Sequence, residues 1–317
     1  MTAFLLQQLV NALTIGAIYA LIALGYTMVY GVLQLLNFAH GALFMLGAYV
    51  AFYLMAWAVG PVGGTIGIIG LTVLYFGTFA IVGALGVGIE RVAHKPLRDS
   101  SRLAPMLSAL GMDIILRNAV QVLVGPQPIA FPPLIDRAPH DVGGVYFNDL
   151  NIEIFIGAVL LMVLLHLFVN RTRLGIQVRA VSESRLISQL LGVNIDRAIS
   201  IIFFIGPGLG AVAGIMYSSY YGVMTFSMGI IMGIKAFTAA ILGGIGSIPG
   251  AMLGGFILGI IETFGAGFLP LLSGGAIGSE YRDIFAFAIL IIVLIFKPAG
   301  IFGEAVTEEA TVYKRDF

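Results

Sequence analysis

The first 89 residues contain no Lys, Arg, Asp or Glu, and the first such residue is Glu90. A soluble domain has about a quarter of its residues charged, which covers its surface. One apolar helix needs about 20 residues to cross the hydrocarbon core of a membrane. The uncharged stretch therefore predicts several crossings. A secretory signal peptide begins with a basic segment, which this N-terminal stretch does not have.

The composition of the whole chain agrees with this interpretation. The 317 residues are 59% hydrophobic and 10% charged, with 16 basic and 16 acidic residues and a mean hydropathy of +1.04. These values argue against a soluble enzyme, a disordered protein and a nucleic-acid-binding protein. Zero cysteines exclude a disulfide framework, a thiolate metal site and a cysteine nucleophile. We predict an all-α polytopic membrane protein with residues 1–317 in one transmembrane domain.

The apolar segments predict eight or nine transmembrane helices. The eight clear spans are residues 9–33, 38–59, 66–89, 103–124, 152–169, 199–221, 256–272 and 284–296. A Gly- and Pro-rich break at residues 60–64 separates the second span from the third. Residues 224–250 are apolar but rich in glycine and contain Lys235. They form either a ninth span or a re-entrant pair of half-helices, because irregular backbone at membrane depth is tolerated only inside protein or along a wet cavity.

The charged residues fall in loops of opposite sign. The first basic loop, at about residues 90–102, contains Arg91, Lys95, Arg98 and Arg102. The second, at about residues 170–198, contains Arg171, Arg173, Arg179, Arg185 and Arg197. The loop at about residues 125–151 is Pro-rich and net acidic, with Arg137 against Asp136, Asp141 and Asp149. The positive-inside rule places the basic loops in the cytoplasm and the acidic loop and the N-terminus outside. A cytoplasmic tail with Lys314 and Arg315 would make nine spans.

Two further patterns concern the packing of the helices. Gly206, Gly210 and Gly214 recur every four residues, a spacing that lets membrane helices approach closely. The triplets Tyr30-Gly31-Val32 and Tyr221-Gly222-Val223 each precede a stretch rich in Gly and Met. They indicate an internal repeat of the inverted kind that is common in transporters.

The chain has no motif for nucleotide binding or catalysis. No Gly-Lys-Ser/Thr sequence occurs, so a P-loop for ATP phosphates is absent. The four histidines do not have metal-ligand spacing. We therefore predict no catalytic residue, no cofactor and no metal site.

Ionisable and polar residues at membrane depth are the candidates for a translocation pathway, because such residues are costly there. Asn37 and His40 either satisfy backbone groups at the start of a helix or line a substrate path. Lys235 either extends to the membrane interface or faces a wet cavity. The remaining candidates are Thr238, in the same segment as Lys235, and Glu262, which has no evident local partner.

The second basic loop also contains a short amphipathic segment. Residues 183–191 predict a helix with Ser182 as its N-cap and Gly192 just after its end. Its apolar stripe consists of Leu186, Ile187, Leu190 and Leu191. Such a helix lies on the membrane or fits the groove of a partner, and the periodicity favours neither.

The loop resembles the coupling segment of ABC importer permeases for branched-chain amino acids, the LivH/LivM family. The matching residues are Leu174, Gly175, Arg179, Ala180, Val181, Glu183 and residues 190–194. Residues 19–26 with 37–41, and residues 235–250, resemble the same family. Two departures are Ala42, where the family often has an acidic residue, and Ser188, where it often has alanine.

The resemblance implies an importer permease of the bacterial inner membrane, in contact with lipid and with no nucleic-acid partner. Its implied partners are a second permease (a copy or a paralogue), two cytoplasmic ABC ATPases and a periplasmic amino-acid-binding protein docking at residues 125–151. The implied ATPase-coupling residues are Gly175, Arg179, Ala180, Val181, Glu183, Leu190 and Gly192. Alternatives are a permease for urea or short amides, a self-contained secondary transporter or channel using Lys235 or Glu262, and a structural membrane subunit.

Overall fold

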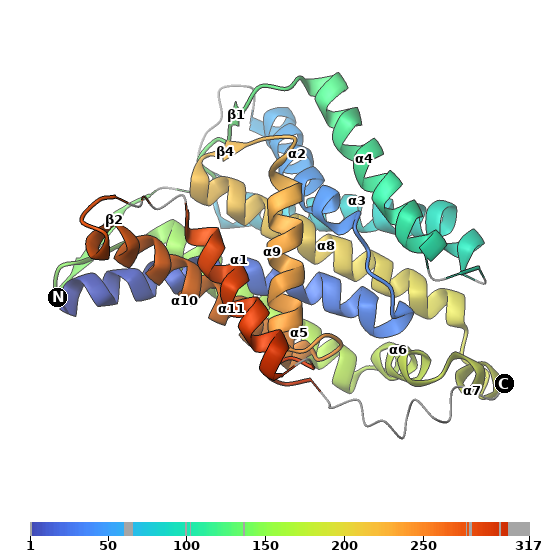
Figure 1. The fold of residues 1–317 in the computed structure, drawn as a ribbon. Helices are drawn as coiled ribbons and strands as arrows, with labels where there is room; N and C mark the ends of the chain where they lie inside the picture. The colour runs from blue at the N-terminus through green and yellow to red at the C-terminus, as the bar shows by residue number, and fades with distance from the viewer. Residues whose placement is uncertain are drawn as a thin grey trace.

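A computed structural model of the chain describes residues 2–59, 66–98, 100–101, 103–135, 137–276, 278, 281–297 and 299–303. Arg102, Asp136, residues 60–64 and the tail with Lys314 and Arg315 lie outside the described residues. Within the described part, helices form almost the whole structure, which confirms the predicted all-α polytopic membrane protein (Figure 1).

The long helices are α1 (Thr2–Leu33), α2 (His40–Val59), α3 (Ile68–Ile89), α4 (Leu103–Val124), α5 (Asp149–Arg171), α8 (Ile195–Tyr221) and α10 (Ile248–Leu272). The shorter helices are η1 (Glu90–His94), η2 (Lys95–Leu97), α6 (Arg173–Glu183), α7 (Arg185–Leu190), α9 (Met228–Gly243) and α11 (Arg282–Phe296). The strands are β1 (Ile129–Ala130), β2 (Pro139–Val142), β3 (Val145–Asn148) and β4 (Val223–Met224). Among the described residues, seven helices are long and apolar enough to cross a membrane: α1, α2, α3 with η1 and η2, α4, α5, α8 and α10.

The glycine-rich segment 224–250 does not form the re-entrant pair of half-helices that was one of its two predicted structures. α9 is one continuous helix of 16 residues and not a pair of half-helices. The chain turns after it at Gly244 and Gly246, both with positive φ angles. α10 then starts at Ile248, eight residues before the predicted span 256–272, because Ser247 caps it by accepting from the Gly250 N–H (3.1 Å). The glycines of residues 250–255 thus belong to a helix.

The helix ends gather into two opposite faces. Gln7, near the start of α1, donates from Nε2 to the carbonyl of Tyr146 (2.8 Å), and β1 pairs with β4. We call the start of α1, residues 125–135 and 137–148, and β4 the acidic end. The end of α1, residues 90–98 and 100–101, α6 and α7 form the basic end, on the other side of the bundle in Figure 1.

α1 and α10 pack closely and run antiparallel. A Cβ added to Gly255 would lie 2.3 Å from Ala20 Cα, and one added to Gly259 would lie 2.4 Å from Gly16 Cα. Only glycine permits this approach of the two backbones. Because Gly267 lies against Gln8, the end of α10 is at the acidic end of the bundle. α11 starts after nine intervening residues with Arg282 and Asp283, which contact Glu262 of α10 and Lys235 of α9 inside the bundle.

The two Tyr-Gly-Val triplets lie at the ends of two long helices, α1 and α8, and differ in backbone conformation. The first lies in the last turn of α1, whereas Gly222 of the second ends α8 with a φ of 70°. Residues 34–39 link α1 to α2 and residues 222–227 link α8 to α9, six residues in each case. The two following helices cross where Gly41 and Gly229 touch. Because α1 ends at the basic end and α8 at the acidic end, the two helix pairs correspond in inverted orientation.

Candidate functional site

The predicted coupling residues lie on α6 and α7, with Gly192 just after α7, and α6 follows a tight turn after α5. Thr172 caps α6 by accepting a hydrogen bond from the Gly175 N–H (3.0 Å). A Cβ on Gly175 would lie 2.2 Å from the carbonyl oxygen of Phe168 and 2.5 Å from that of Val169. A side chain is therefore excluded at Gly175, and this contact sets the direction in which α6 leaves α5.

The second half of α6 contains four further coupling candidates, Arg179, Ala180, Val181 and Glu183. Val181 is buried, whereas Arg179 and Glu183 are exposed. Arg179 donates from Nη1 to the side-chain oxygen of Asn170, at the end of α5 (3.4 Å). The buried side of α6 thus packs on the bundle while its charged side chains face outward.

α7 is shorter than predicted and starts at a different cap. The predicted helix of residues 183–191 was to start at Ser182, but Ser184 is the N-cap and accepts from the Ile187 N–H (3.4 Å). The predicted end is confirmed, since Gly192 has a φ of 81°. Gly192 and Val193 donate to the carbonyls of Gln189 (3.0 Å) and Ser188 (2.9 Å), a Schellman motif.

The predicted apolar stripe of α7 is exposed. Leu190 and Leu191 are 80% and 76% exposed, and Leu186 and Ile187 also face away from the bundle. Ser188, on the opposite side, is buried. An apolar patch on a loop helix is typical of a surface that another protein or a membrane covers.

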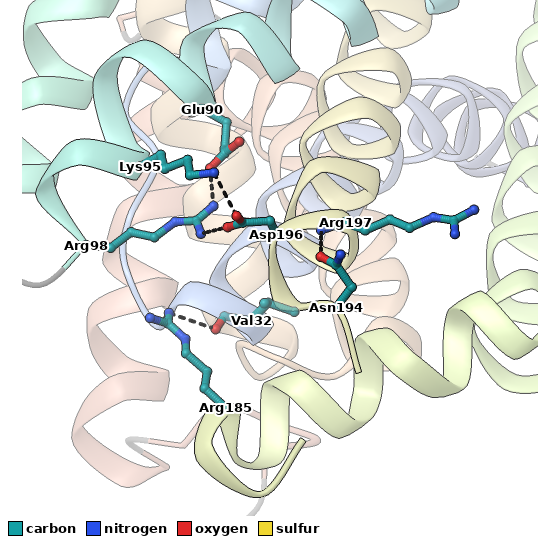
Figure 2. A network of polar contacts seen from close by, with 8 residues as sticks. All are labelled: Val32, Glu90, Lys95, Arg98, Arg185, Asn194, Asp196 and Arg197. Atoms are coloured by element: carbon teal, nitrogen blue, oxygen red, sulfur yellow. Dashed lines mark hydrogen bonds and ion pairs between the residues drawn. The ribbon is translucent and has the colours of Figure 1, made fainter. Parts of the chain in front are cut away.

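A network of charged side chains ties α8 to the end of α3. Asp196, in the first turn of α8, accepts from Lys95 Nζ (2.7 Å) and from Arg98 Nη1 (2.6 Å), as Figure 2 shows. Arg98 also pairs with Glu90, whose side chain is buried. The exposed Lys95–Asp196 pair contributes about 1 kcal/mol or less. Loss of Arg98 would leave Glu90 buried without this partner, at a cost of about 3–5 kcal/mol.

Arg185 ties α7 to the end of α1. Its Nη2 donates to the carbonyls of Val32 (3.2 Å) and Leu33 (3.4 Å), and Figure 2 shows the contact with Val32. The last carbonyls of a helix have no partner within the helix and carry partial negative charge, so a guanidinium stabilises them. Between this contact and the start of α4 lies a cavity of about 380 Å³ that Glu183 and Arg98 line.

The sequence alone indicates only that Arg98, Arg185 and Lys95 are cytoplasmic charges, and it does not distinguish Asp196 or Glu90 from other acidic residues. Asp196 pairs with Lys95 and Arg98, 101 and 98 positions earlier in the chain. The local signal was an acidic residue two positions after the cap residue Asn194, which accepts from the Arg197 N–H (2.9 Å). An acidic residue there suits the start of a helix, but its partners depend on the tertiary fold.

Asn37 and His40 lie at the junction of α1 and α2. The Asn37 side chain accepts from the Ala39 N–H (3.2 Å), as the helix-start interpretation predicts. His40 is fully buried, and its Nε2 lies 3.2 Å from the carbonyl oxygen of Ile22 in α1. The His40 ring fits between α1 and α8 because Gly25 and Gly210 have no side chains there.

Lys235, Thr238 and Glu262 are buried inside the bundle. Lys235 Nζ lies 2.7 Å from Glu262 Oε1, and Tyr19 of α1 donates to Glu262 Oε2 (2.8 Å). Thr238 donates to the carbonyl of Ile234, one turn earlier in α9 (2.9 Å). The partner of Glu262 was not evident in the sequence because Lys235 lies 27 residues away on another helix.

The candidates thus form separate groups along α1. Arg185 contacts its end, and Ile22 and Tyr19, one turn apart, contact His40 and Glu262. A displacement of α1 would therefore affect every group. α1 is also the most thoroughly buried of the long helices.

The apolar helices, with two loops of opposite charge, define a multi-pass membrane protein. A family model described as the branched-chain amino acid transport system / permease component matches residues 8–294. The chain belongs to this family of transport permeases, which are not enzymes. The resemblance noted in the sequence is thereby confirmed, and the bacterial relatives together with the apolar helices support a location in the bacterial inner membrane.

Proteins named as permeases of this transport system are similar to the chain over nearly its whole length. BraD of Pseudomonas aeruginosa, a high-affinity branched-chain amino acid transport system permease protein, is 43% identical over 312 residues, which cover 96% of this chain and 97% of BraD. LivH of Escherichia coli strain K12, with the same description, is 41% identical over 310 residues, covering 96% and 98%. A probable LivH of Methanocaldococcus jannaschii is 28% identical over 312 residues, covering 92% and 91%.

Proposed function

We propose that the chain is the permease subunit of an ATP-driven importer for branched-chain or related amino acids. The descriptions of the similar BraD and LivH proteins support this class of cargo. The chain has no Gly-Lys-Ser/Thr sequence, so a separate ATPase subunit would bind the nucleotide. Two ATPases, a second permease (a copy or a paralogue) and an amino-acid-binding protein would complete the importer.

The exposed apolar stripe of α7 is the observation that carries this proposal. It lies at the basic end, which the positive-inside rule assigns to the cytoplasm. A short amphipathic helix binds a partner by placing its apolar side chains in a groove. We assign the groove to the ATPase, so that Leu186, Ile187, Leu190 and Leu191 bind it and Arg179 and Glu183 flank the contact.

The contacts of α7 suggest how ATPase motion would reach the membrane. Arg185 joins α7 to the end of α1, and Asp196 joins the following helix to the end of α3. A rigid-body displacement of α6 and α7 would therefore shift α1, α3 and α8 together. In this mechanism the buried groups on α1, with Asn37, His40, Lys235, Thr238 and Glu262, line or control the translocation pathway.

The acidic end offers a surface for the amino-acid-binding protein. β2 and β3 pair as an antiparallel hairpin, and its side chains Val142 and Tyr146 are more than half exposed. The hairpin is attached to α1 by reciprocal contacts of Gln7 with the backbone of Tyr146. Binding there would act on the opposite end of the same helix that Arg185 contacts.

The test is the substitution Leu190→Asp in the complete importer. Leu190 is 80% exposed, so the free energy of unfolding of the isolated chain should change by less than about 0.5 kcal/mol. A buried charge in the ATPase groove should abolish co-purification of the ATPase and lower ATP-dependent leucine uptake by at least about tenfold. The matched control is Gln189→Asp on the neighbouring exposed position, which should keep both.

Two results would contradict the proposed function. One is normal ATPase binding and uptake in the Leu190→Asp variant. The other is leucine uptake that continues when ATP is depleted, which is the behaviour of a self-contained secondary transporter. Urea uptake by the same complex, without leucine uptake, would show that the cargo is urea and not an amino acid. The assignment as an ATP-driven permease would then still hold.

A further inference from the structure

Five side chains from four helices form a buried ion network. Lys235 and Glu262 are each 1% exposed and pair at 2.7 Å. Tyr19 donates to Glu262 (2.8 Å) and accepts from Lys235 Nζ (3.3 Å). α11 adds Arg282, whose Nε lies 3.1 Å from Glu262 Oε1, and Asp283, whose Oδ1 lies 2.8 Å from Lys235 Nζ. Two cations and two anions are thus paired crosswise.

One side of the ion network is open. The side chains of Arg282 and Asp283 are 34% and 36% exposed, whereas the side chains of Lys235 and Glu262 are at most 2% exposed. Glu262 lies between Gly259, which packs against Gly16, and Gly267, which packs against Gln8, so the ion network lies beside the first half of α1, the half nearer the acidic end. The open side therefore belongs to the half of the protein that faces the acidic end.

The cost of an unpaired charge restricts what can enter such a network. A buried ion that loses its partner is strongly destabilised, and ionisable groups at membrane depth stay paired. An uncharged solute such as urea brings no charge to replace a broken pair. A solute with a single charge pairs with network residues of the opposite sign only. The residues of its own sign then lose their partners and stay buried without a counter-charge. A zwitterion replaces a cation and an anion at the same time, so that every charge stays paired.

We propose that the ion network binds the ammonium and carboxylate groups of a zwitterionic amino acid that arrives from the acidic end. The carboxylate exchanges into the contacts of Lys235 and Arg282, and the ammonium into those of Glu262 and Asp283. The Tyr19 hydroxyl keeps Glu262 oriented during the exchange. This inference rests on the proposed permease function and assigns a place in the chain where its cargo is recognised.

The test measures the thermal stability of the purified full chain in detergent with millimolar ligand, and it needs no ATPase or binding protein. Leucine should raise the midpoint of unfolding by about 2–4 °C, because a ligand that binds only the folded state stabilises it. Leucinamide has no carboxylate, isocaproate has no ammonium and urea has neither charge. These three compounds should leave the midpoint unchanged.

Variants separate ligand binding from structural support. Lys235→Met and Arg282→Gln should each remove the shift caused by leucine. Arg282 is one-third exposed, so its variant stays measurable if Lys235→Met does not fold. The matched control is Asp113→Asn, which removes the membrane ion pair of Asp113 with Arg117 on α4 (2.6 Å) and should keep the shift.

Three results would overturn the site. They are the absence of a shift with leucine in the unmodified chain, equal shifts with urea or leucinamide, and a full leucine shift in Arg282→Gln. ATP-dependent leucine uptake that is normal in the Arg282→Gln variant would also overturn the site while the permease function stands. Loss of the proposed function would instead appear as uptake without ATP in the unmodified importer.

Discussion

At the scale of single residues, Gly175 sets the junction between the membrane bundle and the coupling helices. A methyl group there would lie 2.2 and 2.5 Å from two backbone carbonyl oxygens of the last turn of α5. We predict that Gly175→Ala lowers the free energy of unfolding by about 1–3 kcal/mol, the usual cost of overpacking. Thermal unfolding of the purified chain measures this change.

The control for Gly175→Ala is Gly88→Ala in α3. Apart from the backbone of its own helix and its chain neighbours, no atom lies within 4 Å of a Cβ added at Gly88, and alanine favours the helix over glycine by about 1 kcal/mol. Gly88→Ala should therefore be neutral or slightly stabilising. Equal destabilisation by the two substitutions would show that the close contact of Gly175 has no special importance.

The residue scale also shows what sequence could and could not predict. Gly192 was predicted as the residue after α7 because a helix often ends on a glycine with positive φ, and its φ is 81°. The cap at the other end was assigned to Ser182, yet Ser184 holds it, because both serines suit an N-cap. The pairing of Lys235 with Glu262 and of Arg98 with Asp196 could not be predicted, since these residues meet only through the packing of distant helices.

At the scale of elements, the Arg185 side chain attaches α7 to the end of α1. Its hydrogen bonds to the last carbonyls of α1 contribute about 1 kcal/mol to stability, yet they are a direct link between the proposed ATPase contact and the most buried helix. We predict that Arg185→Met lowers ATP-dependent uptake by about tenfold while the chain still inserts and folds. Uptake by the assembled importer and the unfolding midpoint of the chain are the two measurements.

The matched control for Arg185→Met is Arg197→Met in the same loop. The Arg197 side chain points away from the network in Figure 2, and only its backbone N–H takes part in a contact drawn there. Arg197→Met should retain normal uptake. A similar loss in both variants would indicate that the net positive charge of the loop matters rather than the link to α1.

Helices were predicted well where apolar runs end in charge or proline, and less well where glycine is dense. The spans that became α3, α4, α5 and α8 were located because charged or Gly- and Pro-rich loops bound them, whereas the start of α1 at Thr2 was predicted seven residues late. Residues 224–250 were harder, because glycine in water-soluble proteins breaks helices. In this bundle Gly243, Gly250 and Gly254 instead bring α9 and α10 into backbone contact. Glycine density therefore marked close helix packing and not a break in α9.

At the scale of the whole molecule, the proposed contacts with the ATPase and with the amino-acid-binding protein lie at two opposite ends. α7 and the Arg98–Asp196 network occupy the basic end, and the β2–β3 hairpin occupies the acidic end. α1 connects the ends, with Gln7 at one and Leu33 at the other. An importer needs this arrangement, because the binding protein and the ATPase act on opposite sides of one membrane.

The absence of cysteine from the sequence allows a direct test of this orientation. A single cysteine introduced as Tyr146→Cys, at a position 63% exposed in β3, should react with a membrane-impermeant maleimide added to intact spheroplasts. Leu190→Cys, at a position 80% exposed in α7, should react only after the membrane is permeabilised. The positive-inside rule predicts this pattern because Arg179, Arg185 and Arg197 lie on the side of α7. Labelling of Leu190→Cys in intact spheroplasts would reverse the topology, and α7 could then not be the element that binds the ATPase.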